Sequence, residues 1–231
     1  MLVLAGTLLA AFGSQVVTFA ILHRLGVLSV RAGRPGPTTQ LLLATVGDVA
    51  VALYLLAVLP LLAKRSLAAL GIRAPKGREI GIGLLGGLAM VAIANPLAAF
   101  MQSFTHATHP EAALALLKGL HEPWQIAAFV GLACVLAPIA EELVFRAFLF
   151  NAVARYGGFW PAAAISSLIF GLVHVSSSPL DILVFALPLA FGGIVLAVVY
   201  TRAKCYWSNV IAHALFNTVS VVAILVFHAT A

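Results

Sequence analysis

The chain has 231 residues, of which 63% are hydrophobic and only 9% are charged, and its mean hydropathy is +1.11. An ordinary soluble domain carries about 25% charged residues, so this composition excludes a soluble domain and a disordered chain. The formal net charge of +6, from 13 Lys and Arg against 7 Asp and Glu, is reached without a polybasic tract. This balance is typical of a membrane protein with basic loops and argues against nucleic-acid binding.

Seven apolar segments follow one another along the chain, each close to the roughly 20 residues that a helix needs to cross a bilayer. They cover residues 2–22, 40–63, 80–104, 126–154, 159–175, 180–200 and 207–227. We therefore predict an all-α fold, a polytopic bundle of about seven transmembrane helices, and expect it in the plasma membrane of a prokaryote. Pro138 lies inside the fourth segment and is expected to kink or split that helix. A short interfacial helix is expected over residues 111–120.

The basic residues divide unevenly between the two sides of the predicted membrane. Eight fall on one side: Lys64, Arg65, Arg73, Lys76, Arg78, Arg155, Arg202 and Lys204. Four fall on the other side: Arg24, Arg31, Arg34 and Lys118. The excess of cations favours the first side as cytoplasmic, whereas the first segment, whose flanking cations all follow it, indicates the opposite. The sequence leaves the orientation open.

Few ionisable side chains fall inside the apolar segments, where each costs at least about 2.5 to 3.5 kcal/mol near the centre and is a functional candidate. Asp48 stands alone in the second segment without a basic partner, and we predict a structural or lipid-edge role for it. The others belong to three motifs in the C-terminal half of the chain: Glu141-Glu142-x-x-x-Arg146, Phe170-x-x-x-His174 and His213-x-x-x-Asn217.

Helical spacing predicts different positions for the two adjacent glutamates. Glu142 and Arg146 are four residues apart, so they share a helix face and are expected to form an ion pair. Glu141 is rotated from that pair by about 100° and remains able to face a polar cavity. His213 and Asn217 also share one face, so their polar groups can converge.

Depth along the helices suggests which side chains meet. At about 1.5 Å per residue, Glu141 and His174 each lie about 20 Å from the turn between the fourth and fifth segments, and are therefore level. His213 lies only about 9 Å into the last segment if that helix begins at Trp207. It reaches the level of the other two only if the helix begins earlier, near Arg202.

A buried carboxylate beside imidazoles can activate water. A glutamate in an apolar pocket is suited to general base catalysis, and a histidine can orient the same water. A second histidine and an asparagine amide can donate to a developing oxyanion. These groups predict a hydrolase of acyl compounds, most plausibly of peptide bonds, and the serine motif Gly-x-Ser-x-Gly is missing.

Two other interpretations stay open. Two histidines and a carboxylate are a common zinc-binding set, so a divalent metal such as zinc is a possible cofactor, with Glu141, His174 and His213 as candidate ligands. A transporter or a non-catalytic scaffold could use the same polar residues to relay protons or to bind a partner helix. Ionisable groups gathered in one cluster rather than along a pathway favour the enzyme.

The three motifs, in this order on successive segments, resemble the CPBP intramembrane protease family, also called the Abi or type II CAAX prenyl endopeptidase family. The resemblance covers about residues 120–226. It implies a catalytic helical core over residues 120–231. Residues 1–119 match the family only as apolar spans, and we predict that they form N-terminal transmembrane helices. The expected substrates are prenylated, leader or other membrane-associated peptides, and the expected partners are these substrates and the bilayer, with no nucleic acid.

The resemblance also implies roles for individual residues. Glu141 and His174 would activate water, and His213 and Asn217 would support the oxyanion. Three further residues would support the site: Glu142, Arg146 and Phe170. The family is described both as glutamate proteases and as metalloproteases, so the resemblance leaves the metal open.

Overall fold

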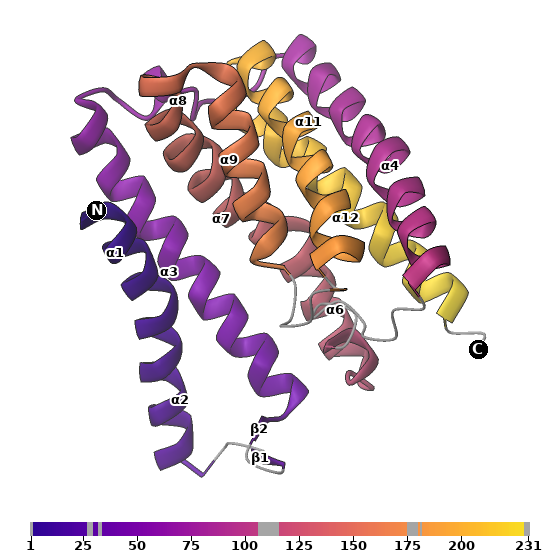
Figure 1. Ribbon diagram of the computed structural model, residues 1–231. Coiled ribbons are helices and arrows are strands. Elements are labelled where there is room, and N and C mark those ends of the chain that lie inside the picture. The colour runs from indigo at the N-terminus through magenta and orange to yellow at the C-terminus, as the bar shows by residue number, and fades with distance from the viewer. Residues whose placement is uncertain are drawn as a thin grey trace.

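The computed structural model describes residues 2–26, 30–31, 34–105, 116–174, 180 and 182–228. It is a bundle of long helices, which confirms the predicted all-α class (Figure 1). Within the described residues, strands are limited to β1 (Val30–Arg31) and β2 (Arg34–Pro35), which pair antiparallel. The interfacial helix expected over residues 111–120 lies largely outside the described residues.

The helices follow the predicted segments closely. In the N-terminal half they are α1 (Leu2–Leu8), the π-helix η1 (Leu9–Gly13), α2 (Ser14–Arg24), α3 (Pro37–Ala63), the 3₁₀-helix η2 (Ala68–Leu70) and α4 (Gly77–Thr105). In the C-terminal half they are α6 (Pro123–Gly131), η3 (Leu132–Leu136), α7 (Ala137–Glu142), η4 (Leu143–Phe150), α8 (Asn151–Gly157), α9 (Phe159–Leu172), η5 (Ile182–Ala186), α11 (Leu187–Ala203) and α12 (Tyr206–His228), of which η3, η4 and η5 are π-helices.

Six helical stretches within the described residues are long and apolar enough to cross a membrane, which agrees roughly with the predicted seven. They are Gly6–Arg24, Pro37–Ala63, Gly77–Phe104, Pro123–Gly157, Val184–Ala203 and Tyr206–Val226. The remaining predicted segment is α9, which is apolar but has only 14 residues. It ends at Leu172, so His174 lies in the turn after the helix rather than inside a span.

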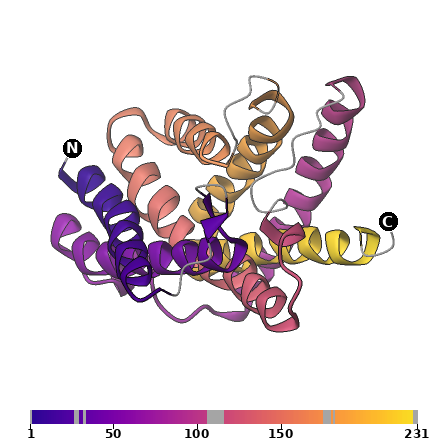
Figure 2. The same cartoon turned by 90° about the horizontal axis from the view of Figure 1, so that it is seen from below.

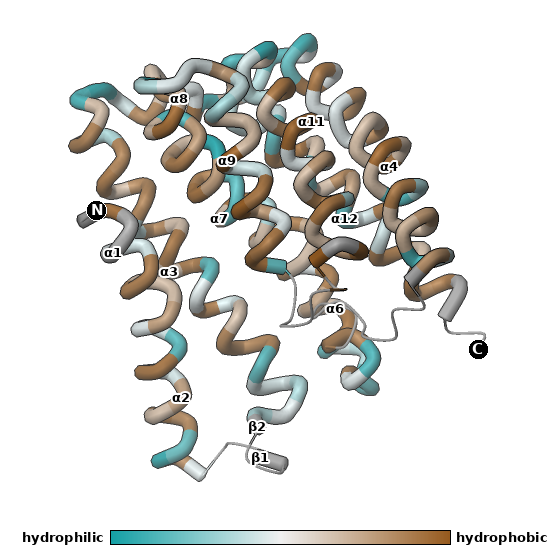
Figure 3. The backbone as a smooth tube through the Cα atoms, in the orientation of Figure 1, coloured by the Kyte–Doolittle hydropathy of each residue, from teal (hydrophilic) through white to brown (hydrophobic). Residues whose placement is uncertain are grey.

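Large apolar side chains point outward along the helices. Leu53, Leu61 and Leu85 are 64%, 75% and 69% exposed. Figure 3 shows apolar residues along the helices, with hydrophilic residues mainly at their ends and at a few positions inside the bundle. An apolar outer surface of this kind belongs in lipid, because the bilayer rather than water solvates it. The protein is an integral, multi-pass membrane protein.

Pro138 does not split the fourth span. The Ala137 N–H bonds to the carbonyl of Leu132, five residues back, so the chain is π-helical immediately before the proline. Pro138 has no N–H, and the carbonyl of Ala133 therefore lacks its partner in the helix. The Asn217 side chain on α12 supplies the missing donor, with Nδ2 2.8 Å from the Ala133 oxygen. The span from Pro123 to Gly157 thus remains one continuous helix.

Glycines bring α4 against α12, the helix that carries His213. A Cβ at Gly83 would lie 2.6 Å from the Ser208 carbonyl oxygen, and one at Gly87 would lie 2.8 Å from the Ala212 oxygen. Both distances are too short for a real Cβ, so only glycine permits this close approach. The views in Figures 1 and 2 agree in placing α4, α11 and α12 beside one another. This packing holds α12 close against α4.

Candidate active site

The three motifs lie on helices that pack against one another. Glu141 and Glu142 end α7, and His174 follows α9. α12, which carries His213 and Asn217, packs against both α7 and η3, and α9 packs against η4. Residues about 70 positions apart in the chain therefore meet at the end of α7.

The predicted ion pair between Glu142 and Arg146 is present and completely buried. Arg146 Nη1 donates to Glu142 Oε1 at 2.9 Å, and both side chains are 0% exposed. Arg146 Nη2 also donates to the carbonyl of Gly193 in α11 at 3.2 Å. Because each charge is balanced inside the protein, neither is presented to lipid.

Glu142 is also the anchor for the polar face of α12. Its Oε1 accepts from His213 Nδ1 at 3.0 Å, and its Oε2 accepts from Asn209 Nδ2 at 2.9 Å. Asn209 is fully buried and donates to the Leu196 carbonyl as well. Asn209 belongs to none of the three motifs and was not predicted as a site residue, although its position four residues before His213 places it on the same helix face.

Glu141 lies between two imidazoles. Its Oε1 is 3.6 Å from His174 Nε2, and its Oε2 is 3.7 Å from His213 Nε2. Glu141 Oε2 is buried and accepts no hydrogen bond from the described residues, which is rare for a native carboxylate. The side chains of Glu141 and His174 are 23% and 25% exposed, against 3% for His213. The cluster is therefore more open on the side of Glu141 and His174 than on the side of His213.

Hydrogen bonds at Nδ1 define the tautomers of both rings. His174 Nδ1 lies 2.7 Å from the Phe170 carbonyl oxygen, which can only accept, so Nδ1 carries a proton. His213 Nδ1 faces the Glu142 carboxylate and carries a proton for the same reason. In the neutral ring the lone pair is then on Nε2, and both Nε2 atoms face Glu141.

Phe170 holds the histidines and Arg146 in place through its ring. The ring centre lies 4.7 Å from that of His174 and 5.5 Å from that of His213. The Arg146 guanidinium lies over the same ring, 4.9 Å from its centre, as a cation–π contact. The first residue of the second motif therefore contacts all three polar side chains by packing.

The depth estimate for His213 is wrong. The helix begins at Tyr206, not near Arg202, and His213 still reaches Glu141. The estimate assumed that every helix starts at the same level. Tyr206 is instead buried, and its hydroxyl donates to the carbonyl of Ile139, so α12 starts inside the bundle.

Asn217 and Asp48 take positions that the sequence did not indicate. One hydrogen of the Asn217 amide is used by the Ala133 carbonyl, as described above. The oxyanion role of Asn217 stays a prediction that rests on its second hydrogen. Asp48 on α3 lies close enough to interact electrostatically with Glu141 and His174, and α3 packs against α7. Asp48 therefore lies near Glu141 and His174 and not at the lipid edge, which was one of the two predicted roles.

The described residues hold no group of three or more His, Cys, Asp and Glu side chains arranged to bind a metal ion. The predicted candidate ligands Glu141, His174 and His213 nevertheless converge.

Comparison with known proteins agrees with the site. Residues 123–219, which include all three motifs, match the Rce1-like family, described as type II CAAX prenyl endopeptidase Rce1-like. The match covers 97 of the 231 residues, so this segment of the chain is similar to that family. The predicted resemblance to the type II CAAX prenyl endopeptidase family is thus confirmed over this segment.

A bacterial protein named as a membrane peptidase is also similar to this chain. Over 88 residues the chain is 36% identical to the protein named "Putative membrane peptidase YdiL" of Bacillus subtilis (strain 168). The match covers 38% of this chain and 34% of that relative, so it spans about a third of the relative's length. No solved structure matches the chain significantly.

Proposed function

We propose that this protein is an intramembrane endopeptidase that hydrolyses peptide bonds of membrane-associated, prenylated or leader peptides. The observation that carries the proposal is the position of the Glu141 carboxylate, 3.6 and 3.7 Å from the Nε2 atoms of His174 and His213. This cluster lies in residues 123–219, the segment that matches the Rce1-like family of type II CAAX prenyl endopeptidases.

The distances suit a water molecule beside the carboxylate. Both are longer than a direct hydrogen bond, and polar groups at such separations are commonly bridged by water. A water that contacts Glu141 and the Nε2 atom of His174 would lose its proton to the carboxylate as its oxygen attacks the peptide carbonyl carbon. Glu141 then returns the proton to the amine that leaves when the C–N bond breaks.

His213 and Asn217 are the proposed donors to the oxyanion of the tetrahedral intermediate. His213 Nδ1 already donates to Glu142, so donation from Nε2 requires the doubly protonated ring. The carboxylates of Glu141 and Glu142 balance that positive charge. Donors that are already positioned stabilise the oxyanion without reorganising during the reaction. A divalent metal such as zinc is the alternative activator of water.

The test is hydrolysis by the purified protein in detergent. Fluorogenic prenylated CAAX peptides and leader peptides serve as substrates for the wild type, Glu141→Gln and His174→Ala. Glu122→Gln is the matched control, because it makes the same chemical change at the exposed start of α6. We expect both site variants to lose turnover by about 10²-fold or more while still inserting and folding.

The same experiment separates the competing functions. Near-wild-type turnover in Glu141→Gln would reject the catalytic assignment. A wild type that hydrolyses none of these peptides would favour a scaffold or a transporter, for which an isosteric change at Glu141 has no hydrolytic consequence.

A further inference from the structure

A second pocket lies apart from the Glu141 cluster. It has a volume of about 1020 Å³ and opens between the end of α3, α8 and the end of α11. None of Glu141, His174 and His213 lines it. Helix ends at this level carry the eight cations counted above, so we call this the basic end of the bundle, at the top of Figure 1.

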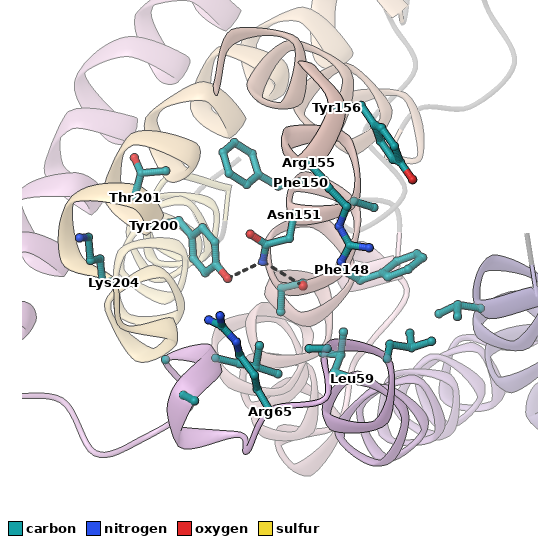
Figure 4. A pocket seen from close by; sticks show the side chains of 18 residues that line it. Leu59, Arg65, Phe148, Phe150, Asn151, Arg155, Tyr156, Tyr200, Thr201 and Lys204 are labelled. Carbon is teal, nitrogen blue, oxygen red and sulfur yellow. Dashed lines mark hydrogen bonds between the residues drawn. The ribbon is translucent and has the colours of Figure 1, made fainter. Parts of the chain in front are cut away.

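Three cations from separate parts of the chain line the pocket (Figure 4). Arg65 follows α3, Arg155 lies in the last turn of α8, and Lys204 caps α11. None of the described lining residues is acidic. The three side chains are exposed and make no hydrogen bond or ion pair to another described residue. Their charge is therefore available to a ligand.

The pocket also offers a neutral hydrogen-bond donor. The Tyr200 hydroxyl accepts from Asn151 Nδ2 at 2.8 Å, which leaves the hydroxyl's own hydrogen to donate. Figure 4 shows this bonded pair between the side chains of Arg65 and Arg155. Two guanidinium groups and a hydroxyl are suited to the oxygens of a phosphate.

Apolar residues form the wall on the α3 side. Leu59 is buried, whereas Leu62, one turn further along, is 48% exposed, and Phe148 of η4 also lines the pocket. Leu61 beside them is 75% exposed on the lipid-facing surface of the same helix. The pocket is thus cationic at the membrane surface and apolar toward the bilayer.

Lys204 is the C-cap residue of α11. A cation at this place is favourable for the C-terminal end of α11 and also faces the pocket.

We propose that this pocket binds an anionic phospholipid of the surrounding leaflet. The headgroup phosphate would lie among Arg65, Arg155 and the Tyr200 hydroxyl, and an acyl chain would lie along Leu59 and Leu62. Basic pockets between transmembrane helices recognise anionic headgroups in this way. The proposal is independent of the peptidase chemistry.

The test measures thermal stabilisation of the purified full chain in neutral detergent. The probes are dihexanoyl phosphatidylglycerol, dihexanoyl phosphatidylcholine, inorganic phosphate and an acidic peptide. The pocket variant is Arg65→Gln/Arg155→Gln. The matched control is Arg78→Gln/Arg202→Gln, which removes the same charge from the same end of the bundle at residues that do not line the pocket.

We expect phosphatidylglycerol to raise the melting temperature saturably in the wild type and the control, and phosphatidylcholine to have no effect. Each basic residue near an anionic lipid contributes about fivefold in affinity, so the pocket variant should bind roughly 25-fold more weakly. Arg65→Lys/Arg155→Lys should retain binding. If the glutamine variant fails to fold, Lys204→Gln carries the test, with binding about fivefold weaker.

Several outcomes would overturn the proposal. Equal weakening in the pocket and control variants would indicate diffuse attraction rather than a site. Equal stabilisation by phosphatidylcholine would remove the role of the anionic charge. Stabilisation by inorganic phosphate as large as by phosphatidylglycerol would identify a free-phosphate site, and stronger stabilisation by the acidic peptide would assign the pocket to a peptide.

Discussion

Removal of Arg146 tests the buried ion pair beside the cluster. Glu142 and Arg146 are both 0% exposed, so Arg146→Ala leaves the Glu142 charge without its only buried cationic partner among the described residues. Breaking such a pair from one side costs about 3 to 5 kcal/mol. Two other donors, His213 Nδ1 and Asn209 Nδ2, still reach Glu142 and soften the loss. Arg146→Ala also removes the cation over Phe170 and the donor to Gly193.

The double variant Glu142→Gln/Arg146→Gln removes both charges and retains groups that can hydrogen-bond to each other. We expect it to melt at a clearly higher temperature than Arg146→Ala, with the wild type above both. The assay is thermal unfolding in detergent followed by tryptophan fluorescence, with peptide hydrolysis measured on the same samples. Equal melting of the single and double variants would reject the ion pair as a source of stability.

Three further predictions concern α12. Asn217→Ala should lower kcat by about 10²- to 10³-fold with little change in KM, because a hydrogen bond to the oxyanion strengthens only as charge develops. An unchanged kcat would exclude Asn217 as an oxyanion donor. If His213 is a metal ligand, His213→Ala should lose bound metal, and added zinc should restore part of the hydrolysis rate. A wild type that is fully active without metal would exclude zinc as the activator of water. Asn209→Leu should destabilise the protein by about 1 to 3 kcal/mol, because Glu142 loses a buried donor; an unchanged melting temperature would show that this contact is not stabilising.

Properties that depend on local spacing were predictable from the sequence. The apolar segments identified a helical membrane protein because the bilayer requires uninterrupted runs of apolar residues. The Glu142–Arg146 pair followed from a four-residue interval within one helix, and the level positions of Glu141 and His174 followed from counting along one helix hairpin. The division of the chain at residues 119 and 120 stays a prediction.

The packing between helices decided the remaining features. His213 reaches Glu141 because α12 begins inside the bundle, and glycine contacts between α4 and α12 allow that approach. Asp48 lies near the cluster although it belongs to no motif and its span comes two spans before that of Glu141.

The group that accepts a hydrogen bond from the Asn217 amide could not be predicted from the sequence, for a similar reason. Its bond to Ala133 exists because a π-helical turn before Pro138 leaves a carbonyl without its helical partner, opposite α12. Intervals along one helix determine which side chains share a face. Contacts between residues far apart in the chain decide where each helix starts and how closely two helices approach each other. Only the tertiary structure brings these residues together.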